Sequence, residues 1–229
     1  MVGRSEAALT LVKRASELSP EVAGLGADRL LPVLPPLAGL FPGGGLRRGS
    51  TVAVSRGRSP GATTLMLALL AAASKAGSWC AIVGVPALGL VAAAEMGVVL
   101  ERTALIPHPG AHHDKVVATL LDGFDIVVAA TLGRPPPALR SQFAARARQH
   151  GCVFVPLREP GGATDWEGAD VSLSTEGSTW HGLGSGRGRL RSRELTVVAR
   201  GRGAAARPRQ VSLWLPGPPV ERPRLAVVR

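Results

Sequence analysis

The segment that decides the fold is "STVAVSRGRSPGATTLMLALLAAASKAG", residues 50–77. Its first part, 50–55, is a short apolar run, which predicts a strand. Its last part, 63–77, has a helical apolar pattern and ends in Gly77, a typical stop signal. Gly and Pro residues between the two parts predict a tight loop. A strand, a glycine-containing loop and a helix therefore follow one another directly.

A loop in this position cradles phosphate when it reads G-x-x-x-x-G-K-[ST]. Here Arg56 stands at the first glycine and Ala62 stands at the lysine, whereas Gly61, Thr63 and Thr64 remain. Thr63 still offers a hydroxyl for Mg²⁺. The sequence thus keeps the frame of a nucleotide site, a vestigial P-loop, without the cation that would neutralise the phosphates.

Strands and helices alternate after this segment. Apolar runs too short for helices predict strands, and longer periodic runs predict helices. Because the strands are continuously apolar, the sheet is expected to be buried on both faces. The predicted fold is α/β, with a largely parallel central sheet and helices on both faces. The predicted strands are 79–85, 103–108, 124–131 and 152–157, and the predicted helices are 89–97, 113–123 and 137–151.

The chain divides into three parts. Residues 1–45 are predicted to form a first helix, from Ser5 to Pro20, and a Pro/Gly-rich lead-in of loop with a short helix. Residues 46–215 form the core, and residues 216–229 are a Pro/Arg-rich, flexible tail. Four short strands after Pro160 are expected to add antiparallel strands to one end of the sheet, with Trp180 and Trp214 in the core. These strands are 169–177, 178–184, 189–203 and 209–216.

The charge of the chain is strongly positive. It has 27 Lys plus Arg against 16 Asp plus Glu, a net charge of +11, which favours polyanionic partners and nucleic acid first. Residues 187–229 hold eleven arginines and two glutamates, a net charge of +9. A solvated edge strand protected by charge, or a surface for an acidic protein, would have the same composition. The residues predicted to bind nucleic acid or a partner are Arg187, Arg189, Arg191, Arg193, Arg200 and Arg202; on a strand the first four share one face.

No metal or cofactor site is expected. His108 and His112 have the spacing of helical ligands, but the prolines around them predict a solvated loop, with Asp114 at the start of the next helix. Cys80 and Cys152 lie in apolar runs and are expected to be buried thiols. The first residues carry charges and lack a signal-peptide core, and no apolar run is long enough for a membrane span. A cytoplasmic location is expected.

The order of these parts resembles the RecA ATPase core over roughly residues 30–215, and the run-in "LAGLFPGGGLRRGSTVAVS" resembles the segment before its P-loop. In that family a glutamate after the next strand activates water, and an aspartate ends the metal-binding strand. Pro86 takes the first position, and Ala129 and Ala130 take the second. Asp125 lies at the wrong end of that strand. Because these groups carry the electrostatics of phosphoryl transfer, the chain is not expected to be an enzyme.

Among RecA-like proteins without these groups, the chain is similar to mutasome accessory proteins of the ImuA family, on the ImuA-prime branch. The resemblance implies a non-catalytic adaptor in the SOS response to DNA damage, acting in mutagenic translesion synthesis. The implied partners are ImuB, a Y-family polymerase relative, and through it an error-prone C-family replicative polymerase and the sliding clamp. DNA is a further expected partner, with nucleoid association after damage.

Two alternatives remain open. One is a SulA-like cell-division inhibitor that binds FtsZ, and the other is a divergent DNA-dependent ATPase. The proline-rich tail ends in an apolar patch with no place in the core, which suits docking onto a partner such as ImuB. The residues assigned to this docking are Arg222, Arg224, Leu225, Val227 and Val228.

Overall fold

The computed structural model describes residues 29–217 except 56, 132, 159–165 and 185–186. At positions 184, 187–189 and 191 it describes the backbone alone. The predicted helix from Ser5 to Pro20 and the tail residues assigned to docking lie outside the described residues.

An eight-stranded sheet forms the centre of the molecule, in the order β10-β9-β8-β3-β7-β6-β4-β5. The six strands from β8 to β5 run parallel, whereas β9 and β10 are antiparallel to their neighbours. The prediction of a largely parallel α/β sheet with added antiparallel strands is confirmed. The strands are β3 (Val52–Ser55), β4 (Cys80–Val83), β5 (Thr103–Ile106), β6 (Ile126–Thr131), β7 (Val153–Arg158), β8 (Val171–Gly184), β9 (Arg187–Gly201) and β10 (Arg209–Leu215).

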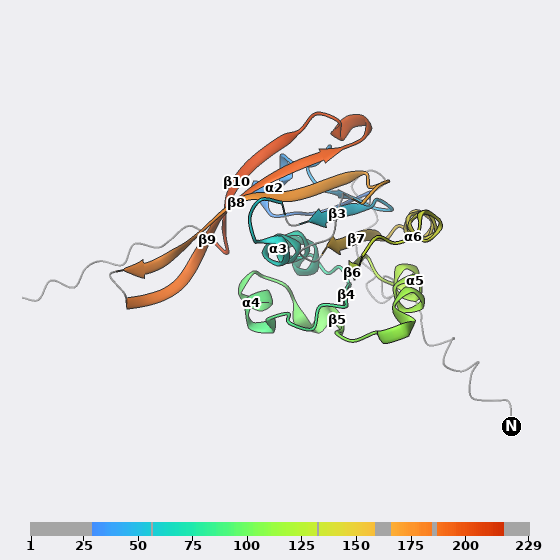
Figure 1. Cartoon of the computed structure of the whole chain (residues 1–229), viewed down its shortest axis with the longest axis horizontal. Helices are drawn as coiled ribbons and strands as arrows, with labels where there is room; N and C mark the ends of the chain where they lie inside the picture. Colours follow the sequence, from blue (N-terminus) through green and yellow to red (C-terminus); the bar gives the residue numbers. More distant parts are fainter. Residues whose placement is uncertain (1–28, 56, 132, 159–165, 185–186, 218–229) are drawn as a thin grey trace, which may run out of the picture.

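Helices cover both faces of the sheet (Figure 1). One face packs on α3 (Ala62–Lys75) and α4 (Leu90–Glu95), and the other packs on α5 (His113–Gly123) and α6 (Pro137–His150). All six residues of β6 are buried, and the first four, Ile126 to Ala129, alternate between the two apolar clusters. This double burial explains why the central strands read as continuous apolar runs. In the described part of the chain, short 3₁₀ helices connect other elements: η3 (Leu100–Arg102), η4 (Gly110–His112) and η5 (Gly203–Ala205).

The Pro/Gly-rich lead-in is part of the core. It forms β1 (Leu30–Leu31), α2 (Pro35–Ala38) and β2 (Leu46–Arg47), with β1 and β2 paired as a small antiparallel sheet. The side chains of Leu37 and Leu46 are fully buried in the same apolar cluster as α3. The short helix expected in this segment is α2, whereas the pairing of β1 with β2 was not predicted because Pro and Gly hide a burial pattern this short.

The last strands differ from the prediction in length. The two short strands expected at 169–184 are one 14-residue strand, β8, which pairs with β3 only over Val171–Ser174. Its partner β9 pairs with β10 only from Arg193 onward. Beyond these points β8 and β9 form a two-stranded ribbon that projects from the body (Figure 1). This ribbon, residues 177–184 and 187–192, is called the arm below.

Trp180 lies on the arm and is 49% exposed, so its expected place in the core is wrong. Trp214 on β10 is half-buried, and its ring lies 4.6 Å from the ring of His181. Within the part of the chain that the structure describes, every helix is too short or too polar to cross a membrane.

Candidate functional site

The described part of the loop between β3 and α3, residues 57–61, is called the strand–helix loop and is bonded to β8. Ser59 donates its backbone N–H to the carbonyl of Thr175 (3.0 Å) and its hydroxyl to the carbonyl of Glu176 (3.2 Å). The hydroxyl of Thr175 donates in return to the carbonyl of Ser59. A phosphate-binding loop keeps its N–H groups free for the anion. Here one of these donors is bonded to the protein itself.

Arg193 of β9 closes the loop from the other side. Its guanidinium donates from Nε to Ser178 Oγ (2.6 Å), from Nη1 to Thr64 Oγ1 (2.9 Å) and from Nη2 to the carbonyl of Pro60. The residue is only 6% exposed, and its guanidinium lies 5.0 Å from the centre of the Trp180 ring. Burial lowers the pKa of the Arg193 guanidinium. The chain therefore places its own cation where α3 begins.

Gly61 makes this closure possible. Its φ of 147° is in the region that favours glycine, and a Cβ there would lie 2.7 Å from Leu195 Cδ1. At Gly57 a Cβ would lie 2.5 Å from the carbonyl oxygen of Thr175. Gly57 and Gly61 thus allow close approach of the strand–helix loop to β8 and β9.

The two threonines at the start of α3 have different environments. Thr64 is half-buried and bound to Arg193, whereas Thr63 is exposed. Pro86 and Ala130 line a cavity of about 680 Å³ at the carboxyl ends of β4 and β6. Of the described residues around this cavity, Asp114 is the one carboxylate, and it lies 3.1 Å from His113 Nδ1.

Asp125 has a structural environment at the amino end of β6. Its carboxylate accepts a hydrogen bond from Arg48 Nη1 (2.7 Å) and one from the backbone N–H of Trp79 (2.8 Å). The side chain is 8% exposed. These contacts tie the start of β6 to β4 and to the lead-in, far from the carboxyl ends of the strands.

The histidine loop and the cysteines are found where the sequence predicted them. His108 precedes η4, and Asp114 lies in the first turn of α5. Among the described residues, no group of three or more His, Cys, Asp or Glu side chains could hold a metal ion. Cys80 and Cys152 are fully buried and unpaired by disulfide. Burial raises the pKa of the Cys80 thiol to about 12, and it raises the pKa of Cys152 further.

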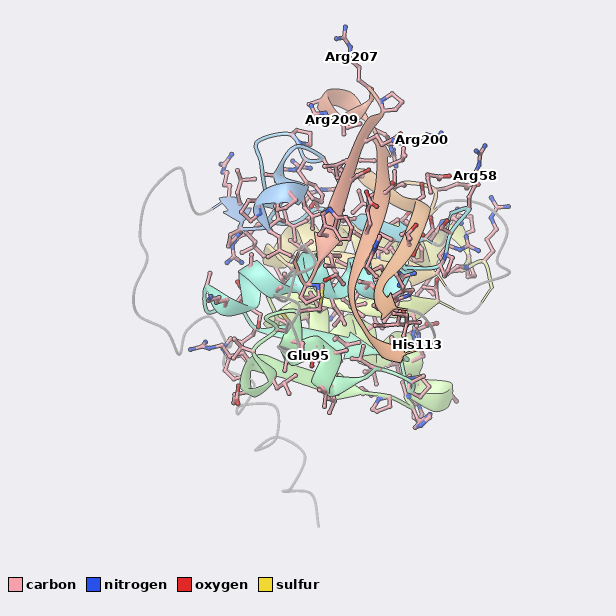
Figure 2. The ribbon with its side chains drawn as sticks, turned by 90° about the vertical axis from the view of Figure 1, so that its left-hand side faces the viewer. Arg58, Glu95, His113, Arg200, Arg207 and Arg209 are labelled. Carbon is pink, nitrogen blue, oxygen red and sulfur yellow. The ribbon has the colours of Figure 1, made fainter. Side chains whose placement is uncertain are left out.

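The six predicted arginines do not form one surface. Arg187, Arg189 and Arg191 lie on the arm, Arg193 is buried at the strand–helix loop, and Arg200 and Arg202 are exposed at the other end of β9. At about 3.3 Å per residue, Arg187 and Arg200 are roughly 40 Å apart along the strand. Figure 2 shows Arg200 with Arg207 and Arg209 at one end of the molecule.

Comparison with known proteins gives the family. Residues 39–168 match the model of the family described as MT3502 N-terminal domain. The chain belongs to this family. The matched MT3502 N-terminal domain region covers the strand–helix loop and runs through β7, whereas β8, the arm and Arg193 lie beyond it.

One curated relative is the uncharacterized protein Rv3395c of Mycobacterium tuberculosis, which is 42% identical over 115 residues. The aligned part is 50% of this chain and 54% of that protein. The chain thus spans about half the length of the relative that it matches.

The sequence did not predict the role of Arg193. The alternation of arginines assigned it to an outer face, but the core residues Leu195, Val197 and Ala199 continue the same alternation. That apolar continuation was the available signal, because a period of two places Arg193 on the core face of β9.

Proposed function

We propose that the chain is a non-hydrolysing, RecA-like adaptor of damage-induced mutagenic translesion synthesis that binds ImuB. In this role the sheet and the strand–helix loop act as architecture. The ImuA-like order of segments supports the assignment, since the residues that would carry ATP chemistry are replaced by Ala62, Pro86 and Ala130.

The observation that carries the proposal is the place of Arg193. Three of its donors are bonded to Ser178, Thr64 and Pro60, so the guanidinium makes its hydrogen bonds within the protein. A nucleotide phosphate would have to displace these bonds and the Ser59 to Thr175 pairing as well. Each buried polar group left unpaired costs about 1–3 kcal/mol, which opposes nucleotide entry.

The first experiment measures nucleotide chemistry on the purified full chain. Single-turnover assays with ATP and Mg²⁺ are expected to show no hydrolysis above background. An Arg193→Ala variant, in which the loop is opened, should also be inactive because the other catalytic groups are absent. Magnesium-dependent turnover that is lost in Thr63→Ala would instead favour the divergent ATPase.

The second experiment identifies the partner. The tagged full chain, purified from DNA-damaged cells, is expected to enrich ImuB with its associated polymerase and clamp. Enrichment of FtsZ, with filamentation on overexpression in undamaged cells, would favour the SulA-like alternative. Recovery of neither protein contradicts the proposed adaptor.

A further inference from the structure

The arm is a cationic ribbon that projects from the body of the molecule (Figure 1). Residues 177–193 hold four arginines, five glycines and neither Asp nor Glu. The guanidinium of Arg193 is hydrogen-bonded at the strand–helix loop and the start of α3. Three arginines therefore remain on the arm itself. The nearest acids, Glu176 and Glu194, are at its base, where Glu176 pairs with Arg58 (3.7 Å).

The base of the arm is fixed on both faces. On one face Trp180 lies against Arg193, and on the other His181 lies against Trp214, with its Nε2 3.9 Å from Glu194. The ribbon therefore leaves the body at a set place. Farther out, Leu183 is 63% exposed and Leu190 is 43% exposed. A two-stranded ribbon is marginally stable in water by itself, and exposed apolar side chains on it are typical of a contact surface.

We propose that the arm is a ribbon that lies in the major groove of double-helical DNA. A groove about 12 Å wide admits a two-stranded β-ribbon, and the glycines at 177, 182, 184 and 188 keep the described part of this one thin. Arg187, Arg189 and Arg191 give the ribbon positive charge for the phosphates that flank the groove. Leu183 and Leu190 supply apolar contact, as with thymine methyl groups. Duplex is favoured over single strand because Trp180 is the one Phe, Tyr or Trp in residues 177–193, whereas single strands stack successive bases on several aromatic side chains.

The other arginine cluster fits DNA less well. Arg202 donates its backbone N–H to the backbone carbonyl of Asp170, whose carboxylate pairs with Arg47 at 3.4 Å, so an acid lies near these arginines. This cluster nevertheless gives a control with the same loss of charge at the opposite end of β9. The inference deepens the proposed function, since an adaptor of translesion synthesis works on DNA, but DNA binding is measured without a protein partner.

The test is fluorescence anisotropy of the full chain with a labelled 20-base-pair duplex and with one of its strands, over a salt series. Each lost phosphate contact should reduce the slope of log K against log salt by about 0.9. The arm variant Arg187→Ser/Arg189→Ser/Arg191→Ser should therefore lower the slope by about two to three and lower affinity at least about tenfold. The control variant Arg200→Ser/Arg202→Ser/Arg207→Ser should keep most of the salt slope and most of the affinity of the wild type.

Several outcomes would overturn the proposal. These are no DNA binding by the wild type, equal losses in the two triple variants, unchanged binding in the arm variant, or single strand bound as tightly as duplex. Urea unfolding of both variants checks that the fold is retained. Loss of ImuB capture but not of DNA binding in the arm variant would assign the arm to a protein, while the proposed function would stand.

A crosslinking measurement tests the same contact without removing charge. A photo-crosslinking residue at Leu183 should form adducts with the duplex. The same residue at Val91 on α4, which is 73% exposed, should form none. Adducts at both positions, or at neither, contradict an arm that lies in the major groove.

Discussion

At the scale of the residue, Arg193 decides what the strand–helix loop can do. It is a buried arginine whose acceptors come from the loop, from α3 and from β8. Arginine suits this place because its planar fork reaches several acceptors at once, which a lysine ammonium on a flexible stem does not. The residue thus joins β8 and β9 to the strand–helix loop and the start of α3, which lie more than a hundred residues earlier in the sequence.

Replacing Arg193 by Ala should lower the free energy of unfolding by about 2–4 kcal/mol, because buried acceptors lose a charged donor. The free energy of unfolding of the Arg193→Lys variant should lie between those of the wild type and Arg193→Ala, since lysine keeps the charge but not the planar geometry. Urea unfolding measures both effects. Arg200→Ala, an exposed residue of the same strand, is the matched control and should change stability by less than about 0.5 kcal/mol. An Arg193→Ala protein as stable as the control would show that the buried contacts contribute nothing.

The buried thiols predict a pH dependence. The pKa of Cys80 is raised from 9.0 to about 12 by burial, so the folded protein keeps this thiol protonated where the unfolded chain ionises it. The contribution of the protonated Cys80 thiol to the free energy of unfolding is complete below about pH 9. This contribution is lost as the pH rises from there toward 12. Urea unfolding between pH 8 and 11 should show this decline, and Ellman's reagent should not label native protein at pH 8.

The control for the thiols is a Cys80→Ala/Cys152→Ala variant. Its stability should fall less steeply over the same pH interval, because the titrating groups are gone. Rapid labelling of the native wild type at pH 8 would contradict buried, protonated thiols.

At the scale of the element, β9 serves three purposes along one strand. Its first part belongs to the arm, its middle closes the strand–helix loop through Arg193, and its last part pairs with β10 over the core. The arm has cross-strand partners on one side only, whereas β6 has a neighbour on each side. Local stability should therefore differ sharply between them.

Hydrogen exchange of the full chain should show this difference. Backbone amides of residues 177–184 are expected to exchange much faster than those of β6, all of whose residues are buried. Addition of duplex DNA should slow exchange in the arm, and addition of the single strand should not. Protection of the free arm equal to that of β6 would contradict a marginal ribbon.

At the scale of the whole molecule, the described core ends on β10. Leu215 is 2% exposed and pairs with Arg193, and it is the last buried residue that the structure describes. The tail residues assigned to partner docking lie outside the described residues. Stability and partner binding are therefore measured separately on a truncated protein.

Deleting residues 217–229 should leave the melting temperature unchanged, since the deletion starts after the last buried residue of β10. It should abolish co-purification with ImuB and damage-induced mutagenesis. A matched control keeps the full tail but reverses its charge, with Arg222→Glu and Arg224→Glu. Comparing ImuB co-purification by this variant and by the truncated protein separates the effect of charge from that of apolar contact. A truncated protein that binds ImuB normally would place the interface on the folded core.

The α/β class and most core elements could be predicted from the sequence by itself. Buried parallel strands must be apolar at every position, and the helices between them must repeat every 3.6 residues, so both patterns are local. The absence of a lysine from the G-x-x-x-x-G-K-[ST] pattern could be read in the same way, because Ala62 is a single residue at a fixed place in that pattern. The buried thiols followed from their apolar neighbours.

Tertiary structure alone decided how the strand–helix loop is closed and how the arginines divide. Residues 178–184 alone read as a separate strand, and their continuity with β8 depends on pairing with β9. Arg193 is more than a hundred residues from Thr64, and no local pattern carries a contact over that separation. The alternation of arginines fixes a face of a strand, but which face meets the core is set by the sheet that the strand joins.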